Sequence, residues 1–210
     1  MAIQPVQRGR ACRVFVVAPR PLSEERGTTG TVLHVLKVLA GAGCEVHVVT
    51  SGSVSPVAID GVVFHRVRQP PRIGPLPGGL SWKRGVLDAI LAVRVWTLLA
   101  AYRFAVVHAF DEAIFFTLPV ARLRGAAVIY HVEFLPSDRI AARSLRRSAL
   151  AITASGALTE RVRAVDRRIP IVQIEDGADV STRFGPKLLE AYAAVLAGRR
   201  SRLSTVTISM

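Results

Sequence analysis

Two histidines stand where predicted strands end, a position from which side chains of a parallel sheet can reach a ligand. His108 closes the apolar run 105–108, and His131 closes the run 126–131. Because the carboxyl ends of parallel strands meet at one edge of the sheet, we expect both imidazoles there as candidate catalytic groups. Asp111 follows at the same edge. It either contacts a ligand or caps the next helix, and capping is the role that we favour.

The loop before the first predicted helix has the composition of an anion site. Gly27, Thr28, Thr29 and Gly30 combine small residues, hydroxyl groups and free amides at a helix start, and such a start attracts phosphate. The alternative is a plain flexible connector. Neither G-x-G-x-x-G nor G-K-[ST] occurs in the chain, so the loop is not a dinucleotide or Walker motif.

Other chemistries lack their sequence patterns. No histidines have the H-E-x-x-H spacing, and Cys12 and Cys44 stand alone, so the sequence predicts no metal and no cofactor. A G-x-S-x-G nucleophile motif is also absent. We expect His34 and His47 to be packing residues and Ser155 to cap a helix.

Strands and helices alternate along the chain. A buried strand at 14–18, a helix whose apolar stripe covers 32–40 and a strand at 45–50 form the first unit, and so short a connection makes the two strands parallel. Asp60-Gly61 predicts a hairpin within 57–67. A long helix is predicted at 82–102. Strands at 105–108, 126–131, 149–153 and 169–174 then alternate with helices at 112–123, 138–147 and 155–165. We therefore predict one α/β, Rossmann-like domain with a mostly parallel, twisted sheet of about seven strands and helices on both faces.

Composition limits the possible partners. A length of 210 residues suits one well-buried domain. The net charge of +13 comes almost wholly from arginine, since lysine occurs only at positions 37, 83 and 187. Such a surface attracts phosphate, anionic lipid or nucleic acid, unless the base composition of the gene explains the arginines. Aromatic residues are few and are not interleaved with arginine, which argues against nucleic acid.

The expected location follows from the ends and the hydropathy of the chain. Residues 1–10 lack the apolar segment of a signal peptide, and no uncharged apolar run is long enough to span a membrane. We expect a reduced, cytoplasmic chain that is soluble or peripheral on the inner face of the membrane. The helix at 82–102, which is apolar around most of its circumference, is the candidate for contact with an anionic membrane surface.

Four segments form an ordered series along the chain: AGCEVHVVT at 42–50, FAVVHAFD at 104–111, ALAITASGAL at 149–158 and IEDGAD at 174–179. In the same order they resemble the motifs G-H-E-V-x-V-x-T, F-D-V-V-H-A-H-D, A-D-x-V-I-A-V-S-E-x-L and I-P-N-G-V-D of family 4 glycosyltransferases of the GT-B fold. The resemblance covers about residues 12–186, which correspond to the N-terminal, acceptor-side domain. Departures include Ala105 where the family has Asp and Phe110 where it has a second His.

The resemblance implies sugar transfer from a nucleotide-sugar to a glycan or lipid acceptor of the cell envelope. It implies that His131 contacts the reacting sugar and that the loop around Gly27 meets phosphate or acceptor. The family's donor-binding domain should begin after Gly177, and its motifs are not found. We therefore expect an enzyme that is inactive or weak alone and is completed by a donor-domain partner chain or by a homodimer. The alternative is a non-catalytic binding or regulatory module that docks on an anionic membrane or on a partner transferase subunit.

The same comparison divides the chain into four parts. We expect an extension over 1–11, the Rossmann-like domain over 12–186, a helix over 187–198 that packs back on the domain, and a solvated tail over 199–210.

Overall fold

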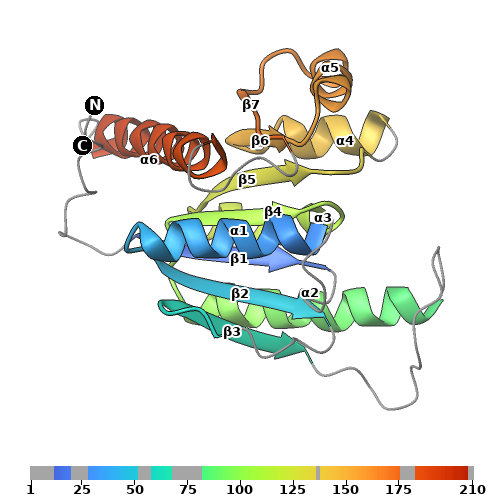
Figure 1. Ribbon diagram of the computed structural model, residues 1–210, viewed down its shortest axis with the longest axis vertical. Coiled ribbons are helices and arrows are strands. Elements are labelled where there is room, and N and C mark those ends of the chain that lie inside the picture. The colour runs from blue at the N-terminus through green and yellow to red at the C-terminus, as the bar shows by residue number, and fades with distance from the viewer. Residues whose placement is uncertain are drawn as a thin grey trace.

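A parallel sheet forms the centre of the molecule. The computed structural model describes residues 12–19, 28–51, 58–67, 82–135, 138–175 and 183–207. Seven strands follow the order β3-β2-β1-β4-β5-β6-β7, and every neighbouring pair is parallel (Figure 1). This confirms the predicted Rossmann-like α/β domain. The strands are β1 (Arg13–Ala18), β2 (Glu45–Ser51), β3 (Val62–Val67), β4 (Val106–Phe110), β5 (Ala127–Val132), β6 (Leu150–Thr153) and β7 (Ile171–Gln173).

The central strands are apolar runs because helices cover both of their faces. Every residue of β4 is buried, and β1 and β2 each bury all but their first residue. Strands of this kind show continuous Val, Ile and Leu in place of an apolar and polar alternation. This is why the runs were readable as strands from the sequence.

Helices α1 and α6 cover one face of the sheet, where Leu36 and Leu188 share a core with Val16. The other four described helices cover the opposite face, where Leu91 and Ile114 share a core with residues of β1 and β4. Figure 1 shows α1 lying across β1 and β4. The helices are α1 (Thr28–Gly41), α2 (Trp82–Ala101), α3 (Ala113–Leu123), α4 (Asp138–Leu145), α5 (Gly156–Val165) and α6 (Gly185–Thr207).

The strand order reverses between β1 and β4. From β1 the chain moves outward to β2 and β3, and from β4 it moves outward in the other direction to β7. In sheets of this kind the loops leaving the two central strands part at this point and leave a crevice at the carboxyl ends of the strands, where ligands bind. The carboxyl edge next to β1 and β4 is therefore the place to look for a site.

The predicted hairpin at Asp60-Gly61 is wrong. β3 pairs parallel with β2, and residues 58–61 form no strand. Gly61 instead makes a turn with φ of +80° that leads into β3, and its carbonyl oxygen accepts a hydrogen bond from the amide of Val46 at 3.1 Å. An Asp-Gly pair reports a tight turn but not whether the strands on either side of it pair with each other.

Helix α2 is apolar on most sides because it packs on two neighbours. Leu91, Val95 and Leu99 lie in the core beneath the sheet. Trp96 donates from its indole nitrogen to the carbonyl oxygen of Phe116 on α3 at 2.7 Å. Packing against both the sheet and α3 accounts for the wide apolar surface of the helix. None of the described helices is long and apolar enough to cross a bilayer.

Helix α6 extends beyond the predicted helix at both ends, from Gly185 to Thr207 in place of 187–198. Leu188, Ala191, Tyr192 and Val195 turn toward the sheet and lie in the same core as α1. The residues of the C-terminal part of the chain are thereby brought over β4 and β5.

Candidate functional site

Strands β4 and β5 bring the two predicted histidines together. Nε2 of His108 lies 3.1 Å from Nδ1 of His131, and both side chains are buried. Phe110 is the register partner of His131, and His108 stands two residues before Phe110, so all three project from one face. The prediction that His108 ends its strand is wrong, because β4 continues to Phe110. His131 is the last residue but one of β5.

The phenyl ring of Phe110 fixes the orientation of both imidazoles. Its centroid lies 4.8 Å from that of His108, with an interplanar angle of 3°. It lies 4.4 Å from that of His131, with an angle of 17°. Stacking on a buried ring restricts the rotamers of both histidines, so the Nε2 atom of His131 keeps a defined direction.

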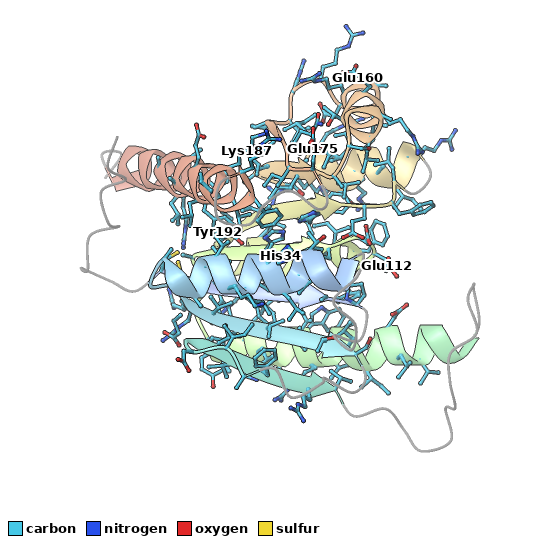
Figure 2. The ribbon with its side chains drawn as sticks, viewed as in Figure 1. His34, Glu112, Glu160, Glu175, Lys187 and Tyr192 are labelled. Carbon is cyan, nitrogen blue, oxygen red and sulfur yellow. The ribbon has the colours of Figure 1, made fainter. Side chains whose placement is uncertain are left out.

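Tyr192 of α6 completes the group. Its hydroxyl lies 2.8 Å from Nδ1 of His108, and the side chain is 3% exposed. Figure 2 shows Tyr192 on the side of α6 that faces the sheet. No local pattern indicates this residue, because the two partners are 84 positions apart and a tyrosine in an apolar helix is normally a packing residue. We call His108, His131 and Tyr192 the histidine group.

Burial keeps the histidine group uncharged. It lowers the pKa of His131 to about 3. The pKa of His108 also lies well below the usual range, because of burial first and of the neighbouring His131 second. Burial raises the pKa of the Tyr192 hydroxyl. At neutral pH each imidazole therefore carries one proton, and the tyrosine keeps its own.

These proton positions leave two arrangements of the hydrogen-bond chain. In one, the Tyr192 hydroxyl donates to His108, which donates from Nε2 to Nδ1 of His131, so His131 carries its proton on Nε2. In the other, Nδ1 of His131 donates to His108, which donates to the tyrosine oxygen, so Nε2 of His131 is a lone pair. Nε2 of His131 is therefore a donor in the first arrangement and an acceptor in the second.

That atom, Nε2 of His131, is buried and has no hydrogen-bond partner among the described residues. A buried polar atom left in this way costs about 1–3 kcal/mol, so a ligand that supplies the bond recovers that cost. Because Nε2 can donate or accept without a charge, a hydroxyl group suits it better than a phosphate. Hydroxyl groups also donate and accept, and sugars are rich in them.

Asp111 has a different role from the helix cap that the sequence favours. The first turn of α3 has Glu112 at its cap position, with no side-chain cap bond. Oδ1 of Asp111 instead accepts from the amides of Glu133 (2.9 Å) and Phe134 (3.0 Å). Its own amide donates to the carbonyl oxygen of His131 at 3.0 Å. Asp111 therefore ties the end of β4 to the end of β5 and holds the two histidine strands in register.

The backbone of Asp111 explains the residue type. Its φ of 43° is the one positive value of a non-glycine residue within the described ranges. Aspartate tolerates this left-handed conformation better than most residues, because its short side chain can form local hydrogen bonds. The turn and the bridge to β5 thus require the same residue.

The predicted anion loop is only partly described. Gly27 and the side chains of Thr28 and Thr29 lie outside the described residues. Helix α1 begins at Thr28, and Gly30 is buried in its first turn. The helix start follows β1, the neighbour of β4, so it faces the carboxyl edge that also carries Asp111. The described backbone thus places the start of this loop's helix at the carboxyl edge of the sheet, next to the ends of β1 and β4.

Two other histidines, His47 and His34, contact side chains of neighbouring elements. His47 lies between His65 (2.9 Å) and Glu45 (3.0 Å) on β2 and β3. His34 packs its ring edge on Phe184. In the part of the chain that the structure describes, no group of three or more His, Cys, Asp or Glu side chains could hold a metal ion.

The cap of α5 and the two cysteines were also predicted from the sequence. Ser155 caps α5 as predicted, since its hydroxyl accepts from the amide of Leu158 at 3.3 Å. Cys12 and Cys44 are free thiols.

Comparison with known proteins places this fold beside glycosyltransferases. No protein-family model and no curated protein matches the sequence. Solved structures do match. The chain aligns with a sucrose-phosphate synthase of Thermosynechococcus elongatus at a TM-score of 0.63 and 13% identity, over 87% of this chain and 98% of that one. It aligns with Arabidopsis thaliana UGT89C1, solved in complex with UDP, at 0.54 and 11%, over 83% and 51%.

A third match is a glycosyltransferase of Rickettsia africae, with a TM-score of 0.52 and 13% identity, over 80% of this chain and 44% of that one. A longer sucrose-phosphate synthase chain is covered to 49%. The chain thus spans about half the length of these longer relatives. At such low identity the comparisons show that the chain has the fold of one Rossmann-like domain of GT-B glycosyltransferases, and they do not show an activity.

Proposed function

We propose that this domain is the acceptor-side half of a GT-B glycosyltransferase of the family 4 type, which transfers a sugar from a nucleotide-sugar to a glycan or lipid acceptor. The observation that carries the proposal is the Nε2 atom of His131, which has no hydrogen-bond partner among the described residues. It is uncharged, buried and held by a ring stack and a hydrogen-bond chain beneath the carboxyl edge of the sheet. A sugar hydroxyl both donates and accepts, so it matches either arrangement of the hydrogen-bond chain.

Roles for the other site residues follow from their positions. His108 orients His131 through the 3.1 Å contact between their rings, and Tyr192 orients His108. The start of α1, with Thr28, Thr29 and Gly30, offers amides of a helix N-terminus beside β1, where a phosphate or an acceptor is stabilised. Asp111 positions the edge and does not need to touch a ligand.

Exposed aromatic side chains at the same edge favour contact with a donor-binding domain. Phe134, which follows β5, is 66% exposed, and Phe115 in the first turn of α3 is 39% exposed. The amide of Phe134 donates to Asp111, so Phe134 lies beside the turn that leads to α3. Aromatic residues are enriched at protein interfaces. A second domain seated here would close the crevice and would bring the nucleotide diphosphate to the histidine group.

The test of the proposal is sugar transfer by this chain mixed with separately produced GT-B donor-binding domains. Uridine, guanosine and adenosine diphosphate sugars are offered with glycan and lipid acceptors, and release of nucleoside diphosphate is measured together with product. We expect turnover only when both chains are present, and weak binding of nucleotide-sugar by this chain alone in calorimetry. Tight binding and turnover by this chain alone would contradict the need for a donor domain.

A pair of histidine variants tests the site itself. His131→Asn removes the ring that presents Nε2, and we expect kcat/KM to fall at least tenfold. The matched control is His65→Asn on β3, which removes a histidine from the edge of the sheet and should leave kcat/KM within twofold. Equal losses in the two variants would show that His131 has no special role in transfer.

A further inference from the structure

Arginines gather around α4, α5 and the amino-terminal ends of β5, β6 and β7. A groove of about 770 Å³ runs between α4 and α5. Its lining includes the apolar residues Leu135 and Val165, and its only charged lining residues are arginines. These are Arg139, Arg143, Arg146, Arg147 and Arg161.

A second hollow of about 1350 Å³ continues from the first. Arg146 and Arg147 line both hollows, so the two are contiguous. The second hollow lies where β5, β6 and β7 begin, at the edge of the sheet opposite the predicted crevice. It adds Arg122, Arg167, Arg168 and Arg199. We call the two hollows together the arginine tract.

The tract concentrates the charge of the chain. Nine arginines line it, and Asp166 is its one acidic lining residue. These ten residues therefore contribute eight of the thirteen net positive charges of the sequence. A bias in the base composition of the gene would raise arginine everywhere and would not collect it in two joined hollows.

Little within the described structure neutralises this charge. Asp166 approaches Arg146 only to 4.0 Å. Arg199 donates to the carbonyl oxygen of Ala105. In the described ranges no other arginine of the tract has an acidic side chain within 4.0 Å. Clustered like charges repel one another, and a bound anion relieves that repulsion.

The form of the tract favours a chain-like anion. A single phosphate would occupy a small part of either hollow, whereas a linear polymer can follow both through the shared Arg146 and Arg147. Arginine binds phosphate oxygens in a bidentate manner. No aromatic residue lines either hollow, so the stacking platforms of proteins that bind single-stranded nucleic acid are missing from the described lining. A polybasic surface also attracts anionic lipid, so vesicles form one arm of the test below.

We propose that the arginine tract is a binding site for a linear phosphate polymer that carries no bases, held through its phosphate groups across α4, α5 and the starting edge of β5–β7. Inorganic polyphosphate has this chemistry and serves as the probe. The site does not depend on the glycosyltransferase proposal, because it lies between α4 and α5 and where β5–β7 begin, and no residue of the histidine group lines either hollow.

Two double variants of the full chain test the site at constant net charge. Arg143→Glu with Arg147→Glu reverses two exposed charges inside the tract. Arg66→Glu with Arg94→Glu reverses two exposed charges on β3 and α2, outside it. We expect end-labelled long-chain polyphosphate to bind the tract variant at least tenfold more weakly than the wild type, while the control variant stays within threefold. The slope of log affinity against log salt should fall by about one to two for the tract variant. Equal weakening in both variants would show that net charge alone attracts the polymer and would overturn the proposal.

Competing ligands separate the polymer from other sources of phosphate. Tripolyphosphate should compete weakly, because it is too short to span both hollows. Vesicles of phosphatidylglycerol and phosphatidylcholine, and a single-stranded oligothymidylate of matched charge, should bind less tightly than polyphosphate. Preference for the vesicles would assign the tract to a membrane surface, and preference for the oligonucleotide would assign it to nucleic acid. Either result would overturn the proposal, as would equal affinity for tripolyphosphate and the long polymer.

Discussion

The Nε2 atom of His108 lies 3.1 Å from the Nδ1 atom of His131, and this contact joins two neighbouring strands through uncharged rings. His108 is bound on its other side by Tyr192, so only one polar atom of the group, Nε2 of His131, lacks a partner among the described residues. The group therefore acts as a unit. A substitution at Tyr192 or His108 should therefore change the hydrogen-bonding character of Nε2 of His131.

Removing the Tyr192 hydroxyl should destabilise the fold. Tyr192→Phe leaves Nδ1 of His108 buried without its partner, which costs about 1–3 kcal/mol in the free energy of unfolding. Urea denaturation measures this loss. Tyr102→Phe is the matched control, because Tyr102 is 37% exposed and its loss of a hydroxyl should change stability by less than about 0.5 kcal/mol. A Tyr192→Phe variant as stable as the control would disprove the hydrogen bond.

Acid should destabilise the protein through its buried histidines. An unfolded histidine binds a proton near pH 6.5, whereas folded His131 binds one only near its pKa of about 3. Between these values the unfolded state holds more protons, so the free energy of unfolding falls as pH falls. Each such histidine contributes up to about 1.4 kcal/mol per pH unit.

Thermal or urea unfolding between pH 7 and pH 4 measures that slope. His131→Phe keeps a ring in the stack but cannot be protonated, so its stability should fall less steeply with acid than that of the wild type. Part of the slope should remain, because burial also lowers the pKa of His108, and burial of His65 lowers its pKa to about 4. An unchanged slope in His131→Phe would show that His131 is not buried as a neutral ring.

Three substitutions of Asp111 separate its bridge from its backbone conformation. Asp111→Asn keeps an oxygen for the amides of Glu133 and Phe134 and tolerates positive φ, so we expect a loss of about 1 kcal/mol. Asp111→Gly keeps the conformation but leaves two amides unsatisfied and should cost at least about 2 kcal/mol. Asp111→Ala adds backbone strain and should be the least stable. Chemical denaturation gives the order, and equal stability of the Asn and Gly variants would contradict the bridging role.

Much of the fold could be predicted because its strands are short apolar runs. The residues of β1 and β4 are buried on both faces, and that burial is visible in the sequence as unbroken apolar segments. The hairpin at Asp60-Gly61 could not be judged in the same way. A tight turn has a local signature in the sequence. Whether the strand after the turn pairs with the segment before it or with another strand is decided by tertiary contacts.

The histidine group was predictable only in part. His108 and His131 end adjacent apolar runs, which placed them near one edge of the sheet. Tyr192 gave no such signal, since only tertiary packing of α6 brings it 2.8 Å from His108. The sequence context of Asp111 favours a helix cap, because capping is the common local use of aspartate. Its actual partners are the amides of the two residues that directly follow β5, which are 22 and 23 positions away in the chain. Contacts between elements are set by the whole fold, and local patterns do not encode them.

Contact between His131 and the reacting sugar is measured most directly by the ring nitrogen spectrum of the five histidines. The chain labelled with ¹⁵N-histidine is mixed with the unlabelled donor-binding domain, and nucleotide-sugars are then added. We predict that the Nε2 signal of His131 moves and saturates with at least one nucleotide-sugar, while the signals of His65 stay unchanged. Polyphosphate, which would bind the arginine tract, should leave His131 unmoved. A His131 signal that does not respond to any nucleotide-sugar, while signals elsewhere do, would contradict the claim that this histidine contacts the reacting sugar.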